Sequence, residues 1–490
     1  MKKGFDNKKY IELQAEAVNK KIKEHSKLYM EIGGKLFDDF HASRVLPGFK
    51  ANSKIEILKK LKDKLEVIFC INANDIERHK IRADYGITYD VEIIRLIDAL
   101  QNEGILVNSV VITLFEGQAN AEIFRKTLER RGIKTYIHTY TKGYPTDVDI
   151  IVSDEGYGAN SYIETTRPLV VVTAPGAASG KLATCLSQVY HEYKRGIKTG
   201  YAKFETFPIW NVPIKHPVNV AYEASTADIN DKNMIDPFHM ENYNKISVNY
   251  NRDIEVFPIL KNILEKITGE CIYKSPTDMG INMTGFAIDD DEKIKIAARE
   301  EIIRRYYKSL NEYKLGLVDE DVPKRIKILM NELNINFDER KVISKALEKY
   351  LNTNYPSIAL KLSNGKIITG RNTDILTSGA SVILNALKSL AKIDDKVLLI
   401  SPVVLEPMLK LKRELYGKNT LLNLQDVLTG LSISSATNPI IEIVLNKLSK
   451  LCDTDAHSSH IVSNQDEEAF RTLGIYLTTE VDYFNNSLKN

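Results

Sequence analysis

Short apolar runs alternate with helical patterns through the first two hundred residues. The runs are β-branched and unbroken, which is typical of strands buried on both faces of a parallel sheet. Between them lie helical patterns such as Val91–Gln101 and Ala119–Arg131. This alternation predicts a doubly wound, mostly parallel α/β sheet up to about residue 195. The predicted strands are Glu66–Ile71, Ser109–Phe115, Thr135–Tyr140, Ile150–Val152 and Leu169–Thr173, and one helix is predicted over Tyr10–Lys35.

The residue composition and the hydrophobic pattern change twice after this region. Proline and aromatic residues around Trp210 and Phe238 interrupt regular patterns, and dense charged helices follow up to about residue 335. A hairpin is then predicted at Asn364-Gly365, since Asn-Gly favours a two-residue turn. We therefore expect an α/β domain over residues 1–235, a mostly helical middle domain over 236–335, and a second α/β domain over 336–490.

The last strand of the first domain runs into a loop of small residues, APGAASGK, and then into a helical pattern. Small residues let backbone N–H groups approach a phosphate, the following helix N-terminus favours an anion, and a lysine adds charge. The sequence predicts a phosphate site here. Its expected binding residues are Gly176, Ser179, Gly180, Lys181 and Thr184.

This loop differs from a Walker A loop in two ways. Gly176 and Gly180 are one residue too close together, and Leu182 stands where a magnesium-binding hydroxyl belongs. The alternative interpretation is an ordinary tight βα turn, with Lys181 solvated beside it. The sequence leaves both interpretations open.

Two acidic residues, Asp154 and Glu155, follow the predicted strand Ile150–Val152. A carboxylate at such a strand end holds Mg²⁺ in many phosphate-binding proteins. Parallel sheets place ligand sites at their carboxyl edge, so this strand end and the small-residue loop would share one edge. We expect Asp154 to hold Mg²⁺ and both carboxylates to be catalytic, although acidic residues also often just end strands.

Polar loops offer further candidates at the same edge. The loop after Glu66–Ile71 carries Asn72, Asp75 and Arg78, and an aromatic-rich stretch earlier in the chain carries His41 and Arg44. Loops at strand ends carry function more often than the strands do. We expect these five residues to contact the ligand, His41 in a catalytic role beside Lys181. The alternative for the loop is a polar surface.

The C-terminal order of hairpin, helix, strand and helix looks like cytidine-deaminase topology, with Lys396–Ser401 as the strand. In that family the strand ends in Pro-Cys-x-x-Cys, which binds zinc. Here Pro402 is present, but Val403 and Glu406 occupy the cysteine positions. We therefore expect no zinc. His457 and His460 are candidate ligand-binding residues, and a polar loop is the alternative.

Composition limits the class of protein. The net charge is +2 over 490 residues, which gives no support for a nucleic-acid partner. No apolar run is long enough to span a membrane, and no signal peptide follows the basic N-terminus. Four widely spaced cysteines favour a reducing, cytoplasmic location. The remaining expected partner is a small phosphorylated ligand, with homo-oligomerisation left open.

Several stretches together resemble a functionally uncharacterised family of conserved bacterial cytoplasmic proteins. They are DFHASRVLPGF at 39–49, the Asn72–Arg82 loop, APGAASGKLATCLSQ at 174–188, YAKFETFPIWNVP at 201–213 and DAHSSHI at 455–461. The resemblance runs nearly end to end. It implies a Rossmann-like α/β domain, a helical part and a C-terminal three-layer αβα domain of deaminase-like topology, and it implies no established reaction. Some relatives carry an ATP-dependent peptidase label, but no HExxH motif supports it here.

The leading hypothesis is an enzyme that binds ATP, another nucleotide or a different phosphorylated small molecule with Mg²⁺, and acts as a transferase or hydrolase. A ligand sensor without catalysis and an interaction or scaffold protein are the alternatives. Turnover of a nucleotide separates the first from the second, and ligand-induced stabilisation separates both from the third.

Overall fold

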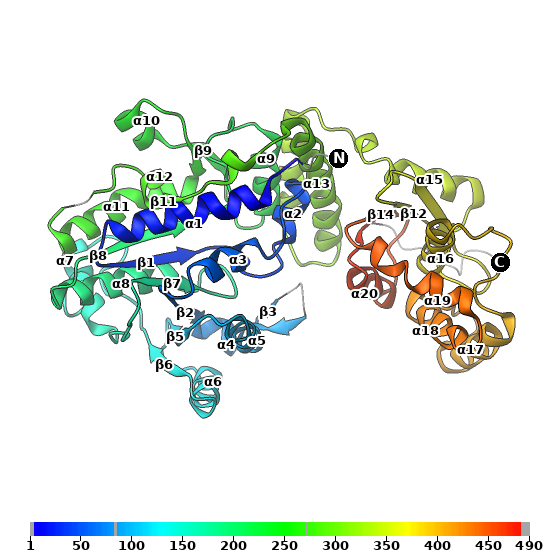
Figure 1. The fold of residues 1–490 in the computed structure, drawn as a ribbon, viewed down its shortest axis with the longest axis horizontal. Coiled ribbons are helices and arrows are strands. Elements are labelled where there is room, and N and C mark those ends of the chain that lie inside the picture. Colours follow the sequence, from blue (N-terminus) through cyan, green and yellow to red (C-terminus); the bar gives the residue numbers. More distant parts are fainter. Residues whose placement is uncertain (1–3, 83–85, 271, 482–490) are drawn as a thin grey trace. The chain divides into compact units, whose positions relative to one another are not determined.

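The computed structural model describes residues 4–82, 86–270 and 272–481. The chain divides into two compact units, residues 1–298 and 299–490, and the sequence-based division into three domains stays a prediction. Figure 1 follows the chain from the first unit in blue and green to the second in yellow and red. None of the helices in the described residues combines the length and apolar character needed to cross a membrane.

A seven-stranded sheet, all parallel, forms the centre of the first unit, in the order β11-β8-β1-β7-β2-β5-β6. The predicted α/β fold with a mostly parallel sheet is confirmed. Every residue of β1 and β7 is buried, which explains the continuous apolar character of β7, whereas β1 buries the charged residues Lys27 and Glu31 as well. The strands are β1 (Lys27–Ile32), β2 (Leu65–Asn72), β5 (Val107–Thr113), β6 (Lys134–Ile137), β7 (Leu169–Thr173), β8 (Thr199–Phe204) and β11 (Gly280–Ile281).

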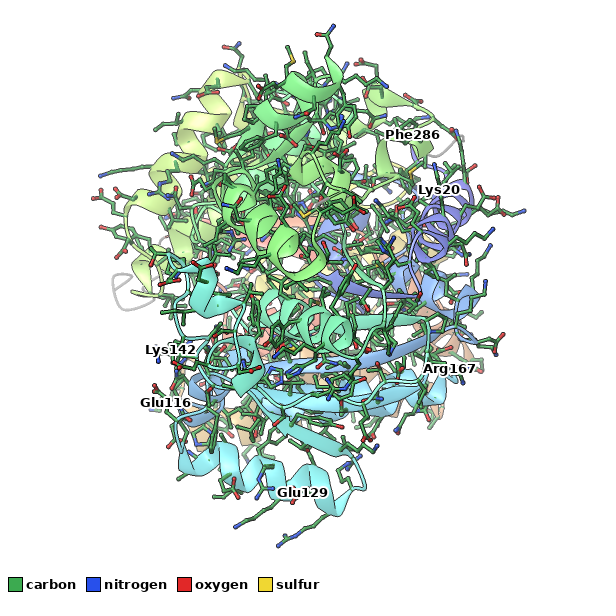
Figure 2. All side chains as sticks on the ribbon, turned by 90° about the vertical axis from the view of Figure 1, so that its left-hand side faces the viewer. Lys20, Glu116, Glu129, Lys142, Arg167 and Phe286 are labelled. Atoms are coloured by element: carbon green, nitrogen blue, oxygen red, sulfur yellow. The ribbon has the colours of Figure 1, made fainter. Side chains whose placement is uncertain are left out.

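Helices cover both faces of this sheet. Helices α1 and α3 pack together on one face, while α8 and α11 pack on the other over a core of buried aliphatic and tyrosine side chains. In the side view of Figure 2, Glu116 and Lys142, which follow strand ends, lie at the opposite edge from Arg167, which precedes β7. The helices are α1 (Asn7–Lys23), α2 (Phe40–Val45), α3 (Ser53–Lys60), α4 (Ala73–Glu77), α5 (Tyr89–Asn102), α6 (Ala119–Arg130), α7 (Val148–Ile151), α8 (Lys181–Lys194), α9 (Pro217–Ser225), α10 (Pro237–Tyr243), α11 (Asn251–Thr268) and α12 (Pro276–Met279).

Two predicted elements of this unit are wrong. The apolar residues of Ile150–Val152 belong to helix α7 and its C-cap, where the Asp147 side chain accepts a hydrogen bond from the Ile150 N–H. The predicted helix Tyr10–Lys35 ends at Lys23, and its second half forms the central strand β1. A short apolar run can form either a helix or a strand. In residues 27–32, pairing with β7 and β8 favours the strand.

The first unit also contains two antiparallel ribbons and two 3-10 turns. Strands β3 (Ile81–Arg82) and β4 (Ile87–Thr88) form one ribbon, and β9 (Asn233–Ile235) and β10 (Val248–Tyr250) form another. The 3-10 turns are η1 (Tyr157–Ala159) and η2 (Thr284–Ala287).

The second unit holds a four-stranded sheet in the order β13-β12-β14-β15 with helices around it. The predicted hairpin is confirmed as β12 (Ser357–Lys361) and β13 (Ile367–Arg371). Residues 396–401, predicted as a strand, lie outside the sheet, and Ser401 instead caps helix α17. The other elements are α13 (Asp291–Lys314), which spans the boundary of the units, α14 (Asp321–Glu332), η3 (Phe337–Glu339), α15 (Val342–Thr353), α16 (Ser378–Ala391), α17 (Pro402–Tyr416), α18 (Leu424–Ser435), α19 (Pro439–Leu445), η4 (Leu448–Leu451), β14 (Asp455–Ser458), α20 (Asn464–Thr472) and β15 (Tyr476–Thr479).

Candidate functional site

The order of the strands marks a topological switch point between β1 and β7. The chain leaves β1 towards β2 on one side, and it leaves β7 towards β8 on the other side. Their following segments therefore diverge, and in open α/β sheets ligands bind in the crevice that this divergence leaves at the carboxyl edge. The small-residue loop, residues 174–180, follows β7 and lies at this point. We call it the β7–α8 turn.

Close packing holds the β7–α8 turn in one conformation. The Ser179 hydroxyl donates to the Gly176 carbonyl, and the Thr113 hydroxyl donates to the Ser179 carbonyl at 2.8 Å. A Cβ on Gly176 would lie 2.5 Å from the Tyr89 hydroxyl oxygen. Gly180 adopts a φ of 81°, which side chains disfavour, and its Cβ would meet Thr113 at 2.9 Å. The two glycines are therefore required by close approach and by backbone conformation.

The backbone N–H groups of residues 176–183 have few acceptors in the described part of the protein. The Ser179 N–H closes the hydrogen-bonded turn at residues 177–178, the other N–H groups donate to no described acceptor, and the first helical bond runs from the Thr184 N–H to the Gly180 carbonyl. Consecutive N–H groups at a helix N-terminus attract an anion, because they are donors in need of acceptors and the helix dipole adds positive potential. This part of the turn has the donors that a phosphate group needs.

The Lys181 side chain reaches the carboxyl end of β1. Its ammonium lies 3.7 Å from a carboxylate oxygen of Glu31, near the carboxyl end of β1, and both side chains are 11% exposed. The other Glu31 oxygen accepts a hydrogen bond from the Tyr201 hydroxyl at 3.1 Å. Lys181 is thus largely buried and paired, rather than solvated beside the turn.

A second group of charges continues from Glu31 along β8. Lys203 pairs with Glu205 at 3.2 Å and also with Asp253, which lies in the first turn of α11. The Trp210 indole N–H donates to Glu205 at 3.3 Å. We call Glu31, Lys181, Lys203, Glu205 and Asp253 the crevice cluster.

The crevice cluster holds three carboxylates and two ammonium groups. Burial raises the pKa of Glu205 to about 7, with Asp253 adding to the rise and Lys203 opposing it. Burial alone would lower the pKa of Lys203, but Asp253 and Glu205 outweigh burial and raise it. Glu205 therefore changes its protonation near neutral pH, which suits a group that transfers a proton.

The loop after β2 contacts the β7–α8 turn, and the predicted contact of its residues with a ligand stays a prediction. The Asn72 amide donates to the Ala178 carbonyl at 3.4 Å. The buried Asp75 pairs with Arg78 and with Lys80, and the Lys80 ammonium lies 5.0 Å from the centre of the Tyr89 ring. Asn72 thus touches the turn directly, whereas Asp75 acts through Lys80 and Tyr89.

His41 lies on α2, which follows β1, and packs among aromatic rings. Its ring centre lies 5.3 Å from that of Phe207 and 5.7 Å from that of Tyr222. Tyr222 packs against Tyr250, over which Lys203 lies at 5.7 Å. His41 therefore borders the crevice cluster through two tyrosines. Arg44 stands three residues further along the same short helix.

Asp154 and Glu155 are placed away from Lys181. Asp154 pairs with Lys194 and accepts from the Tyr190 hydroxyl at 2.9 Å, and Glu155 pairs with Lys142. Tyr190 and Lys194 lie about 14 and 20 Å along the α8 axis from Lys181, at 1.5 Å per residue. Because Ile150–Val152 is not a strand, Asp154 does not reach the edge that carries the turn. The structure does not bring these carboxylates together with Lys181.

Thr184 faces the core. Its side chain is fully buried, and the Cys70 thiol donates to its hydroxyl at 3.4 Å. Burial raises the pKa of Cys70 to about 12, so this thiol stays protonated. Thr184 is not positioned to replace the hydroxyl that Leu182 lacks.

His457 and His460 belong to the second unit and have separate partners. His457 is fully buried on β14, with one ring nitrogen 2.9 Å from the Thr478 hydroxyl and the other 3.3 Å from Glu480. His460 lies 2.9 Å from the Ser459 hydroxyl. Within residues 4–82, 86–270 and 272–481, no group of three or more His, Cys, Asp or Glu side chains is arranged to hold a metal ion.

Sequence reasoning missed three residues of the crevice cluster that β1 and β8 contribute. Glu31 lies in the predicted helix Tyr10–Lys35, and Lys203 and Glu205 lie in a stretch named only for the family resemblance. Alternation was the usable signal, since Tyr201, Lys203 and Glu205 are spaced to share one face of an extended chain. A charged pair on the core face of a strand is unusual enough to indicate a site.

Comparison with known proteins fits the end-to-end resemblance. Residues 3–334 match the family described as domain of unknown function DUF1846, N-terminal, and residues 338–488 match its C-terminal counterpart. The chain belongs to the DUF1846 family. It is 56% identical over 498 residues to a UPF0371 protein of Clostridium tetani (strain Massachusetts / E88), covering 100% of this chain and 99% of that protein. A UPF0371 protein of Clostridium botulinum (strain Langeland / NCTC 10281 / Type F) is 55% identical with the same coverage.

Membership of DUF1846 covers both units of the chain, and the family is one of unknown function. The switch point between β1 and β7 lies within the N-terminal DUF1846 match. Any activity must therefore be argued from the residues around this switch point.

Proposed function

We propose that the first unit binds a phosphorylated small molecule, such as ATP or another nucleotide with Mg²⁺, at the β7–α8 turn. The observation that carries the proposal is the set of N–H groups over residues 176–183 that, Ser179 apart, have no acceptor among the described residues, at the switch point of a parallel sheet. The phosphate accepts from these groups, and Lys181 supplies a positive charge. Asn72 and Ser179 keep the turn in shape through their bonds to its carbonyl groups.

The crevice cluster supplies the chemistry in this proposal. Glu31 is the carboxylate that pairs with Lys181, so it takes the metal-holding role that the sequence analysis gave to Asp154. One carboxylate is enough for that role, because Mg²⁺ is commonly held by one or two carboxylates together with phosphate oxygens and water. Glu205 transfers a proton near neutral pH, and Lys203 balances the charge that remains. The reaction is then a transfer or hydrolysis of the phosphorylated ligand.

The runner-up function is a ligand sensor that uses the same crevice without catalysis. Both functions require the turn to bind the ligand, and only the enzyme requires Glu205 to change its protonation during turnover. Release of phosphate or nucleoside diphosphate from ATP at neutral pH, abolished in Glu205→Gln with ligand binding retained, supports the enzyme. Binding without turnover supports the sensor.

The direct test is a calorimetric titration with inorganic phosphate, ADP and ATP, with and without Mg²⁺. Lys181→Ala should weaken the binding of the phosphorylated ligand by about 1.5–3 kcal/mol, the range for a hydrogen bond to a charged group. The matched control is Lys194→Ala, which removes a lysine from the other end of the same helix. Equal affinities of both variants and the native protein would refute the proposed site.

A further inference from the structure

Helix α17 of the second unit carries a row of exposed apolar side chains. Val403, Pro407, Leu411 and Leu415 follow one another at intervals of four residues, so they form one ridge along the helix. Val403 is 79% exposed, Leu411 58% and Leu415 66%. Exposed apolar side chains scattered singly need no explanation, but a continuous ridge of them marks an interaction surface. Figure 1 shows α17 among the helices of this unit.

A row of alternating charges lies beside this ridge. The row has the same interval of four residues and consists of Glu406, Lys410, Glu414 and Lys418. Each charged residue comes either one position before a ridge residue or three positions after one, so the row and the ridge are neighbours. Among the described residues none of the four side chains forms an ion pair, although the spacing would allow two such pairs within the helix, which ends at Tyr416 before Lys418. The four charges also line a surface hollow of about 430 Å³, together with Leu409 and Arg413.

The order of the charges is complementary to itself when reversed. Read forwards the row is negative, positive, negative, positive, and read backwards it is positive, negative, positive, negative. An antiparallel copy of α17, related by a two-fold axis near position 412, would set Lys410 against Glu414 twice at the centre. Glu406 would face Lys418 at the ends. In the same register Leu411 and Leu415 each fall between two apolar residues of the partner helix, as ridges pack into grooves.

We propose that α17 is the contact of a homodimer, in which it packs antiparallel against α17 of a second copy of this chain. A second copy is the favoured occupant because the two-fold axis brings the same flank of both helices together, so the row must complement itself. The row does so at every position. A single helix pair buries less area than the roughly 1,200 Å² of a standard interface, so we expect a weak dimer, with a dissociation constant in the micromolar range.

The test uses charge reversal in the full-length protein, measured by sedimentation over low to several hundred micromolar concentrations. Glu406→Lys with Glu414→Lys makes the row wholly basic, and Lys410→Glu with Lys418→Glu makes it wholly acidic. Each double variant alone should bind itself at least tenfold more weakly than the native chain does. An equimolar mixture of the two should form a heterodimer at least as tight as the native dimer, because opposite rows then meet.

The matched control reverses Glu12 and Glu16, two exposed acidic residues four positions apart on α1. Glu12→Lys with Glu16→Lys changes the net charge equally and should leave dimerisation unchanged. Leu411→Asp should also abolish the dimer without lowering Tm, since Leu411 is exposed. A native chain that stays monomeric over the whole concentration range overturns the proposal. The ridge would then be covered by another segment or by another protein. A dimer unaffected by both reversals, or a mixture that fails to associate, overturns it as well.

Discussion

Glu31 and Lys181 face each other at 3.7 Å across the switch point of the first sheet, one near the end of β1 and the other at the start of α8. The two residues are far apart in sequence, and the parallel pairing of β1 with β7 brings them together. The pair joins the phosphate-binding geometry of the turn to the buried charges of the crevice cluster. Each of the following predictions tests a part of that arrangement.

Glu31→Gln should separate phosphate binding from metal-dependent binding. The variant removes a negative charge from beside Lys181, so inorganic phosphate without metal should bind about two- to tenfold more tightly, or about 0.4–1.4 kcal/mol. ATP with Mg²⁺ should instead bind more weakly, because the metal loses a ligand. Calorimetry with both ligands measures the two changes, and a shift in the same direction for both would contradict the role given to Glu31.

Glu205 should be visible through the fluorescence of Trp210, the only tryptophan in the chain. The Trp210 indole lies 3.3 Å from the Glu205 carboxyl group, and a protonated carboxyl group quenches indole differently from a carboxylate. A pH titration of the folded protein should show a transition near pH 7, the pKa of Glu205. In Glu205→Gln the transition should disappear. A transition that persists would assign the titration to another group.

The same residue should make the stability of the protein depend on pH. The pKa of Glu205 is about 7 when folded and near its ordinary value of 4.5 when unfolded, so the folded state binds more protons between these values. Its contribution to stability is complete below pH 4.5 and is lost as the pH rises through 7. From pH 5 to pH 8, Glu205→Gln should therefore gain about 1–3 kcal/mol in unfolding free energy relative to the native chain. Urea unfolding followed by Trp210 fluorescence measures this difference.

Gly180→Ala should damage both the turn and the site. Gly180 has a φ of 81°, which costs a residue with a Cβ about 1–2 kcal/mol, and the new methyl group would press on Thr113. We expect a lower Tm and weaker phosphate binding. Gly196→Ala is the control for backbone strain alone, since it also has a positive φ but open space around it. Equal phosphate affinity in both variants would mean that the shape of the turn does not matter.

Asp154→Ala should leave phosphate affinity within about twofold of the native value. Asp154 is exposed and paired with Lys194, further from Lys181 than the roughly 8 Å over which salt screens exposed charges at physiological ionic strength. Calorimetry beside Glu31→Gln provides the comparison. A large loss of affinity in Asp154→Ala would restore the carboxylate role that the sequence suggested for it.

The sequence by itself determined the architecture of the first unit and the location of the turn. Continuous apolar runs such as Leu169–Thr173 predict buried parallel strands, and the small residues after them predict a βα turn with free N–H groups, because both follow from local chemistry. The hairpin of the second unit could also be predicted from local chemistry, because Asn-Gly favours a tight turn.

Only the tertiary structure decided which charged side chains lie close to the β7–α8 turn. The runs at Ile150–Val152 and within Tyr10–Lys35 are short enough to fit a helix or a strand. The first forms helix α7, which Asp147 caps, and pairing with β7 and β8 makes the second a strand. That choice moved Asp154 away from Lys181 and brought Glu31 to it. Lys203, Glu205 and Asp253 joined through β8 and α11, which lie far apart in sequence. Strand order is a property of the whole sheet, so the partners of Lys181 could not be read from the residues around it.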